Sequence, residues 1–313
     1  MLRRVPLVPR LLHRLHRKLL RDWEMLGTPL RRITPLRRLY ILCVDPRRYR
    51  QFALTEWVHQ GLRLQRQAQL PRLCFEDGQA WVRLPNRLEL AYVADIPGDG
   101  LDAEAYYGNY APALTRMLLD VLQDGAVMVD IGANIGWFSL HVAAMYANTR
   151  VYAFEPGDVA LHYLCANVAR NGLTSRVTVI PKAVADVTGT MQFTNDHVAH
   201  ALNHLQPAST TRHDTVCVDT ITLDDFVLEN NIDRLDVIKC DVEGAEFLVL
   251  QGAKETLAQF HPTLFMEIDP FWLQRFAAAP RDIIALLQSY GYQYQVERYA
   301  GEENWLFTHR HAL

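Results

Sequence analysis

The stretch Val129-Asp130-Ile131-Gly132-Ala133-Asn134-Ile135-Gly136 decides the fold. It joins an apolar strand expected over residues 126–131 to a helix expected over residues 137–146. Glycine allows the sharp backbone turn that such a junction needs. The spacing is G-x-x-x-G and differs from the G-x-G-x-x-G of dinucleotide-binding turns, because Asn134 replaces the glycine that cradles a pyrophosphate. We therefore predict a ligand-binding turn at the carboxyl end of this strand, but not one built around a pyrophosphate.

Strands and helices alternate from this turn to the end of the sequence. Short apolar strands separated by helices predict right-handed crossovers and a parallel sheet that is covered on both faces. The last two strands, expected over 292–297 and 305–308, are too close in sequence for a crossover helix and should pair antiparallel. The predicted fold class is α/β, a doubly wound, Rossmann-like, mostly parallel sheet with one antiparallel strand. The other expected elements are helices over 111–122, 159–169, 223–229, 245–259 and 282–290, and strands over 151–154, 177–180, 236–240 and 264–268.

Two acidic residues end neighbouring predicted strands. The negative charge of Asp130 would repel a phosphate and suits a ligand with an ammonium or sulfonium group. Glu155 ends the next strand, where a carboxylate can accept hydrogen bonds from both hydroxyls of a ribose. An adenosine compound with a cation and no phosphate is S-adenosylmethionine. In the alternative interpretation, the glycines only permit a tight turn and Glu155 is a solvated strand end.

A second group of charged residues follows the strand expected over 236–240. Lys239 and Asp241 project to the same face by strand alternation, and Asp241 should lie beside the first strand, close to a methyl donor. Gly244 and Glu246 then open a helix. Burying these charges is costly unless they pair with one another or serve a ligand. A salt-bridge network that only organises the turn is the alternative.

The ordered motifs of this region resemble the FkbM family of S-adenosylmethionine-dependent methyltransferases over residues 110–270. The resemblance implies a seven-stranded class I methyltransferase fold, S-adenosylmethionine as cofactor, and O-methylation of a hydroxyl on a sugar, glycan or natural product. The motifs are Asp130-Ile-Gly-Ala-Asn-Ile-Gly136, Phe154-Glu155-Pro156, Ala183-Val184-Ala185-Asp186, Leu223-Asp224-Asp225-Phe226, Lys239-Cys-Asp-Val-Glu-Gly-Ala-Glu246 and Glu267. The cofactor-binding residues expected on these motifs are Asp130, Gly132, Asn134, Gly136, Glu155, Ala183 and Asp241.

An aliphatic hydroxyl is a weak nucleophile, so its methylation calls for a general base or a metal ion. Asp241, Glu243 and Glu267 are candidates for the base at the correct edge of the sheet. Lys239 could orient a carboxylate, or act as the base if burial lowered its pKa.

Further candidates lie in an insertion over residues 194–218. His197, His200 and His204 would share one face of a helix there, and His200 or His204 could be the base in a lid over the site. Chelation of a divalent metal and a loop of solvated histidines are the alternatives, and no metal site is indicated.

The amino-terminal part has a different character. Residues 1–72 hold 17 Lys and Arg against 4 Asp and Glu, whereas the rest holds 15 against 31. We predict a basic helical module over 1–72, a small β-containing segment over 73–109 and the S-adenosylmethionine-binding domain over 110–313. The basic helix could pack on its own domain, form a homodimer contact through residues 1–35, or bind an anionic membrane surface. A mitochondrial transit peptide is disfavoured by Pro6, Pro9 and the lack of serine. Nucleic acid is not expected as a partner, since the rest of the chain is acidic.

The composition limits the class of protein. Half of the residues are hydrophobic and 21% are charged, which is typical of a globular chain of this length, 313 residues. No apolar run is long enough to span a membrane, and no signal peptide is expected. Five scattered cysteines argue against a disulfide framework and indicate a reducing, cytoplasmic location, with peripheral membrane attachment as an option. Two functional alternatives stay open, an NAD-type oxidoreductase and a non-catalytic scaffold with the same fold.

Overall fold

The computed structural model describes residues 72–76, 79–91, 111–194, 203–207, 215–299 and 302–310. All of them belong to one compact unit that covers residues 69–313. The basic helical module expected over 1–72 therefore lies outside the described residues, apart from its last residue. The expected membrane or dimer contact of residues 1–35, and the candidate bases His197 and His200, also lie outside them.

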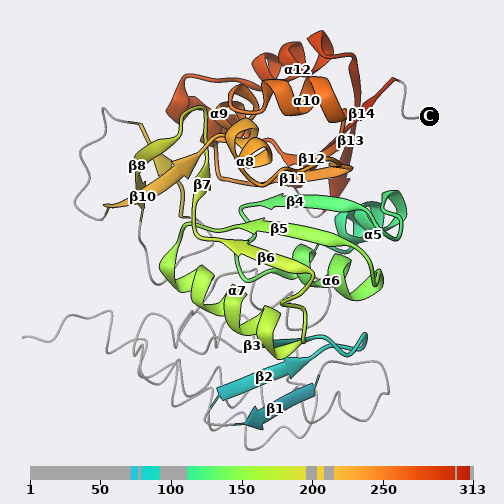
Figure 1. Cartoon of the computed structure of the whole chain (residues 1–313). Coiled ribbons are helices and arrows are strands. Elements are labelled where there is room, and N and C mark those ends of the chain that lie inside the picture. The colour runs from blue at the N-terminus through green and yellow to red at the C-terminus, as the bar shows by residue number, and fades with distance from the viewer. Residues whose placement is uncertain are drawn as a thin grey trace, which may run out of the picture. The chain divides into compact units, whose positions relative to one another are not determined.

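The centre of the unit is a seven-stranded sheet with the strand order β13-β14-β12-β11-β4-β5-β6 (Figure 1). β14 runs antiparallel to both of its neighbours, β12 and β13, and the other six strands of this sheet run in one direction. This arrangement confirms the predicted mostly parallel sheet, and the short turn before β14 is why the last strand reverses. The strands are β4 (Val127–Ile131), β5 (Arg150–Phe154), β6 (Val177–Ile180), β11 (Val237–Cys240), β12 (Thr263–Glu267), β13 (Tyr292–Tyr299) and β14 (Glu302–His309).

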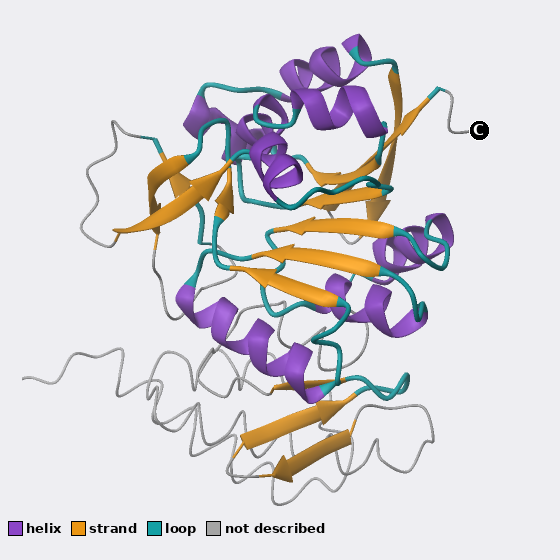
Figure 2. Ribbon diagram, viewed as in Figure 1, coloured by secondary structure: helices purple, strands orange, loops and turns teal. Residues whose placement is uncertain are grey.

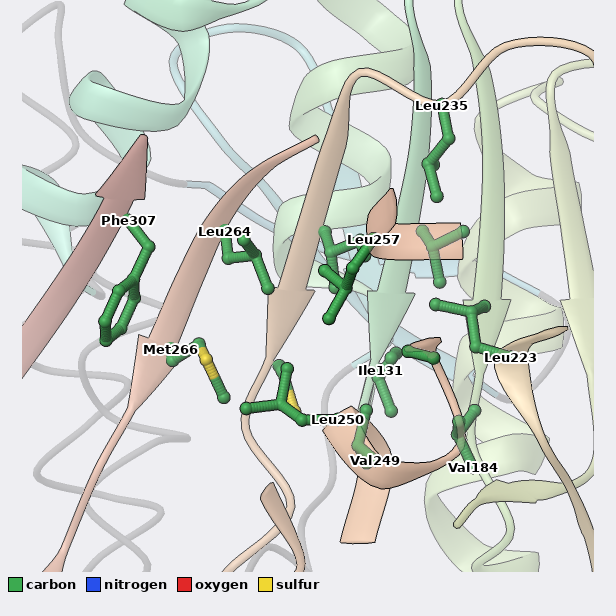
Figure 3. Packing of buried hydrophobic residues seen from close by; sticks show 14 of the residues in the cluster. Ile131, Val184, Leu223, Leu235, Val249, Leu250, Leu257, Leu264, Met266 and Phe307 are labelled. Atoms are coloured by element: carbon green, nitrogen blue, oxygen red, sulfur yellow. The ribbon is translucent and has the colours of Figure 1, made fainter. Parts of the chain in front are cut away.

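Helices cover the sheet as the crossovers require (Figure 2). The helices between β4 and β6 are α6 (Trp137–Met145) and α7 (Asp158–Arg170), and α5 (Pro112–Val121) packs against α6. Side chains of four other helices pack in one buried cluster with strand residues such as Ile131, Leu264 and Phe307 (Figure 3). Those helices are α8 (Leu223–Glu229), α9 (Glu246–Gln251), α10 (Lys254–Phe260) and α12 (Pro280–Ser289), and the short α11 (Pro270–Leu273) and 3-10 helix Gln274–Phe276 follow β12. Full burial of each such apolar side chain contributes about 1.5–3 kcal/mol to folding.

The single helix expected over 245–259 is wrong. Two helices occupy this stretch, α9 and α10, and Gly252 and Ala253 separate them. A Cβ atom built on Gly252 would lie 2.1 Å from the carbonyl oxygen of Ala185. The chain breaks here because the backbone after β7 approaches so closely that only glycine fits. The apolar periodicity continues across the break, so the sequence pattern alone did not reveal it.

A small antiparallel sheet precedes the main domain. It contains β1 (Arg72–Glu76), β2 (Gln79–Arg83) and β3 (Glu89–Ala91) in that order. β1 and β2 form an antiparallel hairpin, and β3 pairs with β2. The third strand of this sheet, β3, is described as three residues, which end at the last described position of this segment.

The insertion after β6 forms a second sheet with the order β7-β10-β8-β9. Its strands are β7 (Ala183–Val184), β8 (Gly189–Thr194), β9 (Leu205–Gln206) and β10 (Thr215–Ile221). The prediction of a helix that carries His204 is therefore wrong. The backbone carbonyl of His204 accepts the Thr194 N–H at 3.0 Å, and its N–H donates to the Thr194 hydroxyl at 2.8 Å. Pairing with β8 takes the backbone groups that a helix would need.

None of the helices in the described part of the chain combines the length and the apolar character that crossing a bilayer would take.

Candidate active site

The candidate site lies where β4 and β11 run side by side. Asp130 is the register partner of Lys239, and Ile131 is the partner of Cys240. The chain order reverses at this pair, because β5 and β6 follow on one side and β12 and β14 on the other. Open α/β sheets bind ligands outside the carboxyl ends of the strands at such a point. The fold therefore brings the glycine turn and the charged segment after β11 to one edge, as the sequence predicts.

The glycine turn is packed tightly against the end of β11. Gly132 and Gly136 have φ angles of 75° and 92°. A Cβ atom on Gly132 would lie 1.9 Å from the carbonyl oxygen of Asp241, and one on Gly136 would lie 2.6 Å from Cδ1 of Leu164. Both glycines are therefore required by contacts within the protein.

Lys239 connects the charged residues of the site. Its Nζ lies 3.6 Å from Oδ1 of Asp130 and 3.3 Å from Oδ2 of Asp241, and it donates a 2.9 Å hydrogen bond to the carbonyl of Gly132. The lysine is 3% exposed and Asp130 is fully buried. The second carboxylate oxygen of Asp130 accepts a hydrogen bond from the Ser139 hydroxyl at 2.6 Å. Asp241 is the more accessible carboxylate, with 23% of its side chain exposed. The predicted juxtaposition of Lys239 and Asp241 is thus observed.

The ion pairs decide the protonation of Lys239. Burial alone would lower its pKa, but the carboxylates of Asp241 and Asp130 hold it above the usual value. The condition for a lysine base, a pKa lowered by burial, is therefore not met. Lys239 is a permanent cation that joins both carboxylates to the glycine turn, which is the orienting role that the sequence allowed.

Glu155 follows β5 and faces the same turn. Its Oε2 accepts the Asn134 N–H at 2.9 Å, and its Oε1 accepts the Gly157 N–H at 2.8 Å. Burial raises the pKa of Glu155 to about 7, although these two hydrogen bonds oppose the shift. Each carboxylate oxygen keeps an acceptor site. Glu155 is therefore held in a fixed position and can still accept hydrogen bonds from a ligand.

The segment after β11 forms a second strained turn. Glu243 and Gly244 have φ angles of 54° and 106°, and a Cβ atom on Gly244 would lie 2.5 Å from the carbonyl oxygen of Trp272. Oε1 of the buried Glu246 accepts the N–H groups of Val242 and Gly244 and holds the turn. Burial, together with the negative charges of Asp241 and Glu246, raises the pKa of Glu243 to about 8. A carboxyl group with a raised pKa thus follows Asp241 by two residues.

Aromatic and basic side chains gather around Trp272, whose backbone lies against this turn. The ring centroids of His204 and Trp272 are 5.3 Å apart, and the Arg275 guanidinium lies 3.6 Å from the centroid of Trp272. His204 is 6% exposed, and its Nε2 lies 2.6 Å from Nε2 of Gln206. The insertion therefore places His204 beside Trp272, which lies in α11 directly after β12.

The other predicted site residues lie at neighbouring strand ends. Glu267 is the last residue of β12 and is half-buried opposite Asn304. Ala183 is buried at the start of β7, where it pairs with Thr220 of β10. Among the described residues, no group of three or more His, Cys, Asp or Glu side chains is placed to hold a metal ion.

Comparison with known proteins names the family. The methyltransferase FkbM domain matches residues 130–294, which is more than half of the chain. The chain belongs to the FkbM methyltransferase family. The seven-stranded sheet of this FkbM protein is accordingly the class I methyltransferase fold, and the family implies S-adenosylmethionine as the methyl donor. The family decides against the dinucleotide-dependent oxidoreductase that the sequence left open.

Characterised relatives of this FkbM protein are distant. Methyltransferase sdnD of Sordaria araneosa is 29% identical over 43% of this chain, and the match covers 62% of that protein. The 31-O-demethyl-FK506 methyltransferase FkbM of Streptomyces tacrolimicus is 25% identical over 58% of this chain and 79% of its own. The hexuronic acid methyltransferase AglP of Haloferax volcanii is 26% identical over 62% of this chain and 75% of its own.

The residues of this FkbM protein fit the donor that its family implies. Oδ1 of Asn134 is buried and has no hydrogen-bond partner, and Asn134 sits at the turn with a φ angle of 49°. An acceptor without a partner, next to the fixed carboxylate of Glu155, suits a ligand with several hydroxyl or ammonium donors. Asp130, in contrast, is fully buried and faces Ser139 and Lys239.

Sequence reasoning missed two contributors to the site of this FkbM protein. Ser139 hydrogen bonds to Asp130, and Asn167 hydrogen bonds to the glycine turn. A serine three residues after Gly136 is a weak signal for the first of these. The second comes from a helix whose packing against the turn is not encoded in local patterns.

Proposed function

We propose that this protein transfers a methyl group from S-adenosylmethionine to a hydroxyl oxygen of a sugar, glycan or related natural product. The observation that carries the proposal is the ion-paired cluster of Asp130, Lys239 and Asp241, which keeps one net negative charge, beside the fixed carboxylate of Glu155. The relatives support the chemistry, since one is named for a 31-O-demethyl substrate and another for hexuronic acid. When bound, S-adenosylmethionine supplies a methyl carbon that its sulfonium has already activated.

Three residues would hold the donor. Glu155 would accept hydrogen bonds from the ribose hydroxyls, because its carboxylate is fixed by two backbone N–H groups. Asp241 would accept from the amino group of the donor, because it is the exposed end of the Lys239 cluster. The unpartnered Oδ1 of Asn134 would accept a further hydrogen bond.

Glu243 is the carboxyl group best suited to take the proton of the acceptor hydroxyl. Asp241 is engaged by Lys239, whereas Glu243 has a pKa raised to about 8 by burial and by its acidic neighbours. A base is most effective when its pKa lies near the working pH. The strained backbone at Glu243 agrees with a functional position.

Replacing Glu243 with glutamine should lower kcat by about 100-fold, the usual cost of losing a general base. In the wild-type enzyme kcat/KM should rise with pH and level off above about 8, because only the ionised carboxylate accepts the proton. The Glu243→Gln variant should lose this rise. The exposed Glu255 on α10 offers the control, since Glu255→Gln should keep both the rate and the pH profile. An unchanged pH profile in Glu243→Gln would assign the base to another group, with Glu267 as the next candidate.

Trp272 and its neighbours would form the acceptor side. The Arg275 guanidinium lies over the Trp272 ring and the His204 ring lies close to it, so aromatic surface and polar groups occur together here. Such a surface suits a sugar ring, which has an apolar face and hydroxyls at its rim. His204 and Arg275 would then contact the acceptor.

Two measurements test the proposed function. Calorimetry with S-adenosylhomocysteine should detect binding, whereas a protein that does not bind it would be a scaffold. Incubation with S-adenosylmethionine and a panel of hexuronic acids, neutral sugars and macrolide alcohols should add 14 Da to one class by mass spectrometry, one CH₂ unit per transfer. Binding of the donor without methylation of any oxygen would contradict the O-methyltransferase assignment.

A further inference from the structure

One asparagine connects the glycine turn to the small amino-terminal sheet. Asn167 lies on α7 and is fully buried. Its Oδ1 accepts the N–H of Ala91 at 2.7 Å, and its Nδ2 donates to the carbonyl of Ile135 at 2.8 Å. Ala91 ends β3, and Ile135 lies in the turn that begins at Asp130. Both ends of one buried amide are therefore used by segments that are far apart in sequence.

On the turn side, Asn167 donates to the carbonyl of Ile135, which lies between two residues with left-handed backbone conformation. Ile135 lies between Asn134 and Gly136, whose φ angles are 49° and 92°. The N–H of Asn134 is bound by Glu155, and the N–H of Gly136 is bound by the carbonyl of Ala133. The bond from Asn167 completes this set. Without it, a carbonyl would be left unpaired beside a buried side chain, which favours reorientation of the turn.

On the sheet side, α7 holds β3 through more than one residue. Asn171, at the end of the same helix, accepts the N–H of Glu89 at 2.8 Å and donates to its carbonyl at 2.7 Å. Arg170 forms ion pairs with Glu76 and Glu89. These two residues attach the sheet to α7, and within the described part of the chain neither side chain hydrogen bonds to the turn. Asn167 differs from them because it holds the sheet and the turn at once.

We infer that Asn167 is a positioning residue for the methyl donor, which couples the seating of β3 on α7 to the shape of the turn that binds the donor. The inference rests on the proposed donor site at this turn. Asn134 supplies an unpartnered acceptor and Glu155 is fixed by the Asn134 N–H, so a shift of Ile135 displaces both. The small sheet therefore contributes to donor affinity although it need not touch the donor.

The substitution Asn167→Asp separates the two bonds. An aspartate still accepts the N–H of Ala91, but its second oxygen cannot donate to the carbonyl of Ile135 and repels it. At pH 8.5 we expect the dissociation constant of S-adenosylhomocysteine to rise at least tenfold by calorimetry. Asn171→Ala is the matched control, because it removes two bonds to β3 and one to the backbone carbonyl of Asn167, but none to the turn. It should lower the melting temperature and leave the dissociation constant within twofold.

Two outcomes overturn the inference. One is equal S-adenosylhomocysteine affinity in the wild type and in Asn167→Asp. The other is an equal loss of affinity in Asn167→Asp and Asn171→Ala, which would assign the effect to general loosening. If the wild-type protein itself does not bind S-adenosylhomocysteine, the proposed function fails, and this failure is distinct from the first two.

Hydrogen exchange in the wild-type protein gives a second test that does not depend on a variant that folds. Coupling is reciprocal, so a donor analogue that stabilises the turn must also stabilise the bond from Ala91 to Asn167. Saturating S-adenosylhomocysteine should therefore slow exchange at the Ala91 amide more than at the Glu89 amide, which Asn171 binds. No change at Ala91, with binding confirmed by calorimetry, would contradict the inference.

Discussion

Replacing Lys239 with methionine should lower the free energy of unfolding by about 3–5 kcal/mol, the usual cost of breaking a buried ion pair from one side. The lysine is the cation that faces both Asp130 and Asp241, and Asp130 is fully buried. Methionine has a similar length, so the loss arises from charge more than from packing. Denaturation by urea, followed by circular dichroism, measures the effect.

The double variant Lys239→Met with Asp130→Asn is the control for this prediction. It removes the buried negative charge together with its partner, so we expect most of the lost stability to return. The Gly132 carbonyl still loses its bond from Nζ, and donor binding should stay weak in the double variant. A double variant as unstable as the single one would show that packing, and not charge, explains the loss. Substitution of Asp130 is therefore expected to change the stability of the fold, whereas substitution of a carboxylate that only faces a ligand would not.

Replacing Glu155 with glutamine should weaken binding of S-adenosylhomocysteine by about 100-fold, close to 3 kcal/mol, since charged hydrogen bonds to two hydroxyls are lost. The affinity of the wild-type protein should fall as the pH decreases below about 7. The pKa of Glu155 is raised to about 7 by burial, and protonation removes the negative acceptor. Titration calorimetry between pH 6 and pH 8.5 measures both effects.

Asp236 provides the matched control for Glu155. It is also a carboxylate that accepts a backbone N–H, that of Val127, but it lies at the opposite end of β4. Asp236→Asn should leave the affinity for S-adenosylhomocysteine and its pH dependence unchanged. A Glu155→Gln variant that binds the donor analogue like the wild type would move the ribose contact away from the end of β5.

Ionised Glu155 costs stability above pH 7, because its folded-state pKa exceeds the unfolded value. A loss of affinity without a large loss of stability would therefore agree with a ligand-binding role.

The parts of the fold that the sequence predicted depend on local patterns. Apolar strands such as β4 and helices such as α8 follow from residue spacing. The short turn between β13 and β14 requires that these two strands pair antiparallel. The split between α9 and α10 could not be predicted in this way, because it depends on Ala185 approaching Gly252 from another part of the chain. The strand β9, which begins directly after His204, was missed for the same reason, since the pairing of His204 with Thr194 is a tertiary contact.

The sequence by itself determined the succession of strands and helices along the main domain, the glycine turn, and the acidic residues that end β4 and β5. These features follow from alternation and turn chemistry, which are local properties. Only the tertiary structure decided which of these charges are free for a ligand. Lys239 reaches the carbonyl of Gly132 across 107 positions and neutralises Asp130, and this pairing depends on the register of β11 against β4. Burial then sets the cost of each charge, and burial is a property of the packed molecule.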